Sequence, residues 1–201
     1  MDNSNKITLD SYQNNFQNYI EGTARSTKDD HFQGQWITSV PNMLTKNARI
    51  LEIGSAFDRD AQFIYEKGYH NLELSDAFDA AVEHLNQKGL PARKLNILQD
   101  DLKESYDAVF ASAVFLHFTR DELRAVLNKL IINLSPTGYL AFSVKQGSGD
   151  EWSDHKMGSP RYFCYWQNDE LVKLLNSSGY KIVDIRNTED QKWIHVVAQP
   201  N

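Results

Sequence analysis

The sequence predicts an α/β fold, in which strands alternate with helices along an open sheet. Residues 50–53 form an apolar run, the small residues of a tight turn follow, and residues 59–67 have a helical pattern. A second short strand, residues 72–76, ends in an acid about 20 residues beyond that turn. Alternating strand and helix patterns then continue to the C-terminus.

Length and composition favour one domain without disulfides or membrane spans. The chain has 201 residues, of which 41% are hydrophobic, so it can build a core. A single cysteine, Cys164, excludes an internal disulfide and suits a reducing compartment. An apolar run of about 18 residues is lacking, so a cytoplasmic location without a membrane partner is expected. The formal charge of -6 argues mildly against a nucleic-acid partner.

The N-terminal residues are expected to lie outside the sheet. Residues 1–9 are polar, lack the apolar core of a signal peptide, and are predicted to be a disordered tail. Apolar residues at helical spacing predict a helix over 9–20, which Gly22 would end. A second helix, with its cap among residues 27–30, is predicted to reach about residue 44.

The remaining elements follow from the same patterns. Thr119 and Glu122 form a capping box at the start of one helix. Residues 135–138 are expected to be a turn, and residues 146–161 a long loop, which in a compact domain is usually functional or mobile. Helices are predicted over 77–88, 120–133 and 168–177, and strands over 92–95, 106–111, 139–145, 180–186 and 192–198.

The turn after the first strand suits an adenosine ligand that carries no phosphates. Gly54 lets the backbone approach a ligand, while Asp58 and Asp60 would repel a pyrophosphate at the helix start. Asp76, at the tip of the second strand, is placed to accept hydrogen bonds from both hydroxyls of a ribose. Taken alone, a strand-glycine-helix unit fits any α/β protein as well as it fits a cofactor site.

These residues resemble the first motif of class I S-adenosylmethionine-dependent methyltransferases. Glu52-Ile53-Gly54-Ser55-Ala56-Phe57-Asp58 is similar to Glu/Asp-x-Gly-x-Gly-x-Gly, with Ala56 and Asp58 where the family usually has glycine. Leu134-Ser135-Pro136-Thr137-Gly138 resembles the family's Leu-x-Pro-Gly-Gly with one change. The resemblance covers most of the chain, roughly from Tyr12 to the C-terminus.

The resemblance implies a Rossmann-like sheet of seven strands, mostly parallel, with helices on both faces and an antiparallel last strand. Residues 10–201 would form a single domain, with a helical lid over 10–46 and the Rossmann-like core over 47–201. S-adenosyl-L-methionine would be the cofactor and S-adenosyl-L-homocysteine the product.

Several cofactor contacts are implied by the same resemblance. Tyr19 and Arg25 match a Tyr-Ala-x-x-x-x-Arg-Ser segment in which the tyrosine closes on the sulfonium pocket and the arginine faces the methionine carboxylate. A core-edge tyrosine and a solvated arginine are the equal alternative. Asn96 stands where the family usually has an acid that contacts the adenine amino group, unless it is a simple loop asparagine. The expected cofactor contacts are Tyr19, Arg25, Glu52, Gly54, Ser55, Ala56, Asp76, Ala77, Asn96, Ile97, Ser112 and Ala113.

Candidates for catalysis are weak. His117 titrates near neutral pH, but its segment resembles one in which the family's histidine is more often structural. Tyr19 and His155 are the other two candidates, and His195 is expected to be structural.

Acceptor contacts are expected near the long loop, because charged and aromatic groups follow it. The alternative is that the aromatic run 161–166 is core for the last helix, and within that run Tyr162 and Trp166 are preferred as pocket residues. The expected acceptor contacts are Lys145, Trp152, Arg161, Tyr162 and Trp166.

The sequence therefore favours a methyltransferase that acts on an unidentified small molecule, as a monomer or a homodimer. It contains no CxxC or HExxH pattern, so no metal is expected. One alternative is methylation of a tRNA wobble uridine, because Arg161-Tyr162-Phe163 and the fourth-strand segment weakly resemble the subfamily with that activity. The net negative charge argues against this alternative. Another is a non-catalytic S-adenosylmethionine sensor or partner-binding module, motivated by Ala56 and Asp58.

Overall fold

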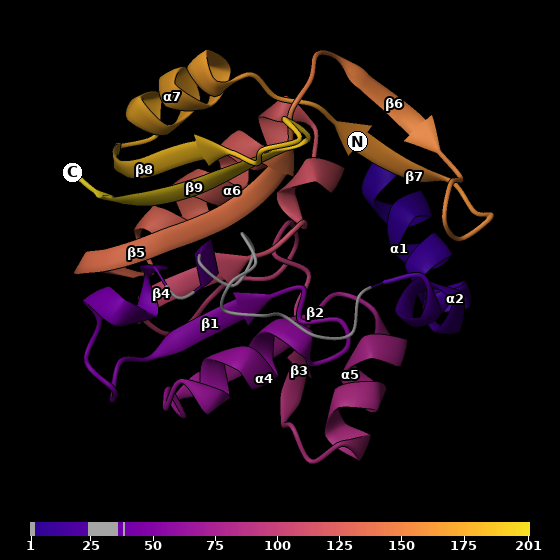
Figure 1. Ribbon diagram of the computed structural model, residues 1–201, viewed down its shortest axis with the longest axis horizontal. Helices are drawn as coiled ribbons and strands as arrows, with labels where there is room; N and C mark the ends of the chain where they lie inside the picture. Colours follow the sequence, from indigo (N-terminus) through magenta and orange to yellow (C-terminus); the bar gives the residue numbers. More distant parts are fainter. Residues whose placement is uncertain (1–2, 24–35, 38) are drawn as a thin grey trace.

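A seven-stranded sheet organises the protein (Figure 1). The computed structural model describes residues 3–23, 36–37 and 39–201. The strand order across the sheet is β3-β2-β1-β4-β5-β9-β8. In chain order these strands are β1 (Ile50–Ile53), β2 (Leu72–Asp76), β3 (Ala92–Lys94), β4 (Tyr106–Ala111), β5 (Leu134–Lys145), β8 (Tyr180–Asn187) and β9 (Trp193–Pro200).

The sheet is parallel except at its last strand. β1 pairs in parallel with β2 and β4, β2 with β3, and β4 with β5. β9 pairs antiparallel with both β5 and β8 and so lies between them. The Rossmann-like sheet with an antiparallel last strand is therefore confirmed. Because β1 to β5 are parallel, their carboxyl ends meet at one edge, where sheets of this kind bind ligands.

Alternation along the strands gives each face of the sheet its own core. One core is built on Val109 and Phe142 and is covered by α6 and α7. The other is built on Phe110 and Ala141 and is covered by α4, with Leu85 of α5 on the same side. These helices are α4 (Arg59–Glu66), α5 (Asp79–Gln87), α6 (Arg120–Ile131) and α7 (Asn168–Ser177).

The N-terminal segment is helical from Ser4, so the predicted disordered tail is wrong. α1 (Ser4–Asn14) and α2 (Phe16–Glu21) replace the single predicted helix, with a break at Asn15. α1 lies beside β7 (Arg161–Cys164) in Figure 1. There the Ser11 hydroxyl donates to the Pro160 carbonyl at 2.6 Å, and the Tyr162 amide donates to the Thr8 hydroxyl at 3.0 Å. These tertiary hydrogen bonds hold a segment whose polar sequence suggests no core.

Much of the predicted second helix lies outside the described residues. Its described part includes Trp36, Ile37 and Val40, which are buried as expected. A short 3-10 helix, η1 (Pro41–Met43), follows, so the regular part ends at the proline.

Two segments predicted to be irregular contain strands instead. Residues 135–138 belong to β5. The register between β4 and β5 shifts at this place, so the predicted turn is an irregularity within the strand. The predicted loop at 146–161 contains β6 (Asp150–Ser153), which pairs antiparallel with β7. The sequence of β6 lacks an alternating apolar pattern because the strand is stabilised by pairing with β7 and buries no apolar face. We call this pair the β6–β7 hairpin.

Candidate functional site

Two adjoining cavities lie at the carboxyl edge of the parallel strands. The inner cavity has a volume of about 80 Å³ and includes Asp76 and Asn96 in its wall. The outer cavity has a volume of about 590 Å³ and extends to the β6–β7 hairpin. Both are lined by Tyr12, Tyr19, Gly54, Ala56, Ser112, Ala113 and His117. The shared wall makes the two cavities parts of one site.

The turn after β1 keeps a glycine-like backbone although only one of its three key positions is glycine. Gly54 has φ +75°, and a Cβ atom there would lie 2.3 Å from Cγ2 of Val114. Ala56 and Asp58 also have left-handed φ angles, of 51° and 77°. A left-handed residue with a side chain costs about 1–2 kcal/mol. The chain thus retains the loop geometry at these two departures, at a cost in stability.

Asp76 fastens this turn to the end of β2. Its carboxylate accepts hydrogen bonds from the amides of Ala56 at 2.9 Å and Ala77 at 2.7 Å. Burial raises the pKa of this carboxyl to about 6, and the backbone donors oppose the rise. A carboxylate has about four acceptor positions, so it retains capacity for a ligand hydroxyl.

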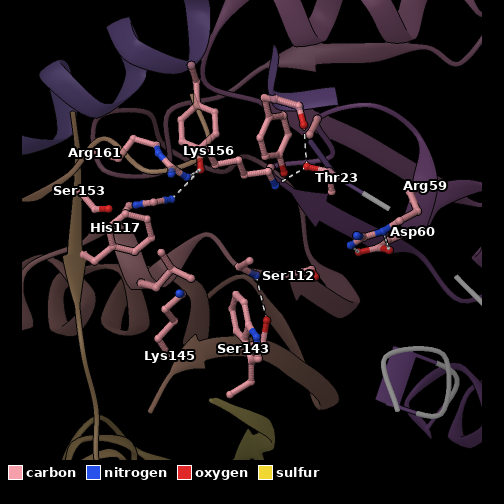
Figure 2. A pocket seen from close by; sticks show the side chains of 18 of the residues that line it. Thr23, Arg59, Asp60, Ser112, His117, Ser143, Lys145, Ser153, Lys156 and Arg161 are labelled. Carbon is pink, nitrogen blue, oxygen red and sulfur yellow. Dashed lines mark hydrogen bonds and ion pairs between the residues drawn. The ribbon is translucent and has the colours of Figure 1, made fainter. Parts of the chain in front are cut away.

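The acidity expected of the turn is partly neutralised. Asp58 forms an ion pair with Lys88 of the neighbouring helix region, with the two atoms 2.9 Å apart. Asp60 pairs with Arg59 at 2.6 Å. Figure 2 shows this second pair at one side of the outer cavity.

Every expected cofactor residue that the structure describes lines one of the two cavities. The inner cavity takes Tyr19, Gly54, Ala56, Asp76, Ala77, Asn96, Ile97, Ser112 and Ala113. The outer cavity adds Glu52 and Ser55. Arg25 lies outside the described residues.

Asn96 is partly engaged with the protein itself. Its amide donates to the side chain of Asn5 at 3.2 Å, and its oxygen accepts from the amide of Leu98 at 3.1 Å. Asn5 also lines the inner cavity. The sequence missed Asn5 because it lies in the segment predicted to be disordered.

Glu52 is a buried carboxyl in the wall of the outer cavity. Burial, followed by the charge of Asp60, raises its pKa to about 8. Its Oε2 atom has no hydrogen-bond partner among the described residues. A buried acceptor that lacks a partner is costly, so the position suits a ligand that brings a donor or a positive charge.

His117 is held as a neutral ring by two hydrogen bonds. Its Nδ1 atom lies 2.6 Å from the Tyr162 carbonyl oxygen, and its Nε2 atom lies 2.9 Å from the Tyr12 hydroxyl. A carbonyl can only accept, so Nδ1 carries the proton and Nε2 accepts from Tyr12. Burial lowers the pKa of His117 to about 4. This geometry gives His117 a structural role and leaves it little use as a general base.

The other two catalytic candidates also lie at the outer cavity. Tyr19 and His155 both line it. Burial raises the pKa of Tyr19 well above its ordinary value, so the phenol stays protonated. The backbone carbonyl of His155 accepts a hydrogen bond from the Arg161 guanidinium.

Strand alternation decides which residues of the β6–β7 hairpin face the outer cavity. Arg161, Phe163 and Tyr165 line it, together with Glu151 and Ser153. Their intervening neighbours point the other way. Of the five residues expected to contact the acceptor, Lys145 and Arg161 line this cavity, and Trp152, Tyr162 and Trp166 do not.

The three aromatic side chains that do not line the cavity pack elsewhere. Trp152 is 48% exposed and packs edge-to-face on Tyr162. Trp166 is buried beneath the guanidinium of Arg120, whose central carbon lies 4.6 Å from the ring centroid. The alternative that these aromatics belong to the core holds for Tyr162 and Trp166, which are both part of the first hydrophobic core.

Several residues in the cavity walls were not singled out by the sequence. Tyr12 is the most central, since it lines both cavities and contacts His117 and Arg161. Its helical spacing marked it only as part of an apolar face. The other such residues include Thr23, Arg59, Ser143 and Lys156.

Within the described residues, no group of three or more His, Cys, Asp or Glu side chains could hold a metal ion. The described helices likewise include none with the length and apolar character that crossing a membrane requires.

Comparisons with known proteins agree on one fold. A family model for a methyltransferase domain matches residues 29–185. No curated protein matches the chain significantly.

Solved structures match over most or all of the chain. The CcbJ methyltransferase of Streptomyces caelestis has a TM-score of 0.74 and 15% identity, covering 100% of this chain and 99% of that one. DhpI, in a complex described as DhpI-SAM-HEP, has a TM-score of 0.75 and 12% identity, with the same coverage of 100% and 99%.

A third match is the 1,6-didemethyltoxoflavin-N1-methyltransferase of Burkholderia thailandensis, solved with 1,6-didemethyltoxoflavin and S-adenosylhomocysteine. It has a TM-score of 0.68 and 18% identity, covering 83% of this chain and 77% of that one. At such identities these structures establish a shared fold.

Proposed function

Because this chain belongs to the class I S-adenosylmethionine-dependent methyltransferase family, we propose that it transfers a methyl group from S-adenosylmethionine to a small-molecule acceptor. The observation that carries the proposal is the continuity of the two cavities across Gly54, Ser112 and Ala113. With its adenosine part at the inner cavity, a cofactor would place its sulfonium and amino-acid part at the outer cavity, beside an acceptor.

The residues of the inner cavity fit the adenosine part of the cofactor. After three backbone hydrogen bonds, Asp76 retains about one acceptor position for a ribose hydroxyl. Asn96 and Ile97 lie in the same wall, where an adenine would pack.

Glu52, in the wall of the outer cavity, and Gly54, which lines both cavities, fit the amino-acid part of the cofactor. The partnerless Oε2 atom of Glu52 would accept from its ammonium group, which would also stabilise the ionised carboxyl. Gly54 lets a ligand approach the backbone closely, because no side chain fits there beside Val114.

The chain's own contribution to the chemistry is to position the acceptor. When bound, S-adenosylmethionine supplies a methyl carbon on a cationic sulfur; the acceptor's lone pair forms the new bond, and the broken bond leaves its electron pair on sulfur. Orientation can supply much of the acceleration of such a displacement. Neither His117, which is neutral and engaged, nor Tyr19, which stays protonated, is suited to remove a proton.

A small acceptor is favoured over a tRNA by the form and charge of the site. The outer cavity, of about 590 Å³, is comparable with sites for small organic ligands, which are typically about 300–1,000 Å³. The net charge of -6 disfavours a nucleic-acid partner. The solved 1,6-didemethyltoxoflavin-N1-methyltransferase, which has the same fold, holds a small-molecule acceptor.

Calorimetry of the purified protein with S-adenosylmethionine and S-adenosylhomocysteine tests this proposal, with NAD as the control ligand. We expect binding of the first two and none of NAD. Release of S-adenosylhomocysteine in the presence of an acceptor panel would then identify an enzyme. Binding without release for any acceptor would favour the sensor alternative, and absence of binding would refute the cofactor assignment.

A further inference from the structure

Three cations in the outer cavity lack an anionic partner. Lys145, Lys156 and Arg161 line this cavity, and none of them forms an ion pair with a described residue. The fourth cation, Arg59, is paired with Asp60. Figure 2 shows Lys145 on one side of the open space and Lys156 and Arg161 on the other.

Arg161 is the most buried of the three, with an exposed fraction of 6%. Its guanidinium donates to the Tyr12 hydroxyl at 3.3 Å and to the His155 carbonyl, which are both neutral partners. Its Nε atom is buried without a hydrogen-bond partner among the described residues. A buried charge is costly unless an opposite charge and hydrogen bonds compensate it. The protein alone leaves this compensation incomplete.

The two lysines contact aromatic rings and a hydroxyl. The Lys145 ammonium lies 5.5 Å from the ring centroid of Phe163 and 5.6 Å from that of Trp193. Lys156 lies 4.7 Å from the ring of Tyr19 and donates to the hydroxyl of Thr23. Ring faces attract cations but do not neutralise them.

Mutual repulsion among these cations is detectable at Lys156. Desolvation and, after it, the like charges of Arg161, Arg59 and Lys145 together lower the pKa of its ammonium to about 8. The cations are therefore close enough to repel one another. Such a group stabilises an anion placed among its members.

The acids in the same cavity do not offset the three cations. Asp60 pairs with Arg59, and Glu151, which is exposed, accepts a hydrogen bond from the Tyr165 hydroxyl at 2.5 Å. Burial raises the pKa of Glu52 to about 8, so without a ligand it holds a proton at neutral pH. A cationic cavity in a chain whose net charge is -6 is not explained by composition.

We infer that the methyl acceptor carries an anionic group, a carboxylate or a phosphate-type oxyanion, which binds among Lys145, Lys156 and Arg161. This inference rests on the proposed function and specifies its acceptor class. The cofactor's own carboxylate has the same chemistry and is the other source of such an anion. The acceptor is favoured because the charges that act most on Glu52, where the cofactor's ammonium would bind, are Asp60, Arg59 and Asp76 and none of the three cations. Figure 2 likewise shows Arg59 and Asp60 apart from Lys145 and Arg161.

The test is a titration of the protein saturated with S-adenosylhomocysteine, using benzoate, phenylphosphonate and the neutral analogue benzamide as probes. A charge-assisted hydrogen bond corresponds to roughly a ten- to hundredfold change in affinity, so at least one anion should bind tighter than benzamide by that factor. Lys145→Met and Arg161→Gln should each remove most of this preference. Lys173→Met, which changes an exposed lysine on α7, is the matched control and should leave it unchanged.

Two results would overturn the inference. One is the absence of any preference for the anions over benzamide in the folded wild-type protein. The other is that Lys145→Met weakens S-adenosylhomocysteine but not 5′-methylthioadenosine, which lacks the carboxylate, since the cations would then serve the cofactor. Because Arg161 is buried, its variant is first checked by thermal unfolding, and Lys145→Met decides if that variant is unfolded.

Failure of the proposed function is separately visible. If S-adenosylhomocysteine does not bind, the cofactor assignment fails, and the same probes are titrated into the free protein. A preference for anions that depends on Lys145 would then still support the anion site, and its absence would refute it.

Discussion

Replacing Asp76 by alanine removes the carboxylate at which the glycine turn and the proposed ribose site meet. A hydrogen bond to a charged group contributes about 1.5–3 kcal/mol, so losing the bonds to the ribose should weaken cofactor binding roughly 10- to 150-fold. The three backbone amides that now donate to Asp76, at 2.7, 2.9 and 3.4 Å, would also lose their acceptor. We therefore expect the variant to be less stable as well as weaker in binding.

Calorimetry with S-adenosylhomocysteine measures the first effect, and urea unfolding without ligand measures the second. Asp79→Ala is the matched control, because Asp79 is an exposed acid in the first turn of α5 whose one ion pair with a described residue is to Lys94 on the surface. It should change neither quantity much. The wild-type affinity should also fall as the pH drops below about 6, where Asp76 takes up a proton, while Asp76→Ala should lose this dependence. Equal affinity of wild type and Asp76→Ala would refute the placement of the ribose.

Three further outcomes are expected. The pKa of His117 is lowered from 6.5 to about 4 in the folded protein, so between these pH values the unfolded chain binds a proton that the folded protein does not. The free energy of unfolding should therefore fall as the pH drops from about 6.5 to 4, and urea unfolding of His117→Asn should show a smaller fall. Gly54→Ala should destabilise the protein by about 2–4 kcal/mol, since it adds left-handed strain and a clash with Val114, and unchanged thermal unfolding would contradict the loop geometry. Ala56→Gly should relieve strain and raise stability by up to about 1 kcal/mol by the same measurement, whereas a clear loss would show that its left-handed φ is not strained.

The structure shows how the turn accommodates the two residues that depart from the family's first motif. The sensor alternative depended on Ala56 and Asp58, which replace two glycines. Both residues keep the left-handed backbone that glycine would adopt, and Lys88 pairs with Asp58. The backbone of the turn is therefore retained. The two side chains lower the free energy of unfolding without changing the loop geometry that a cofactor would contact.

Elements whose cause is local could be predicted from the sequence. β4 was predicted with its observed bounds, because an apolar run with its flanking turns defines a buried strand. The Thr119–Glu122 capping box is present, with the Thr119 amide 2.8 Å from the Glu122 carboxylate. Most of the expected cofactor residues lie in or just after a strand at one edge of the sheet, where the order of elements predicts a ligand. Tyr19 precedes the first strand, and its expectation rested on the resemblance.

Features that depend on distant pairing could not be predicted. α1 is held by two hydrogen bonds to the β7 region, which is far away in the sequence: the Ser11 hydroxyl donates to Pro160, and the Thr8 hydroxyl accepts from the Tyr162 amide. The pairing of β6 with β7 decides that Arg161 faces the outer cavity and Tyr162 does not, because a shift of one residue exchanges the two faces of a strand.

The sequence by itself determined most of the strands and helices and their order along the chain, because short-range periodicity and turn chemistry encode them. The topology of the sheet and most of the expected cofactor contacts rested on the resemblance to the family. Only the tertiary structure decided the character of the outer cavity. Lys145 comes from the end of β5, Lys156 from the tip of the β6–β7 hairpin and Arg161 from β7. Their shared position depends on strand register and hairpin packing, which are long-range interactions that no local pattern specifies.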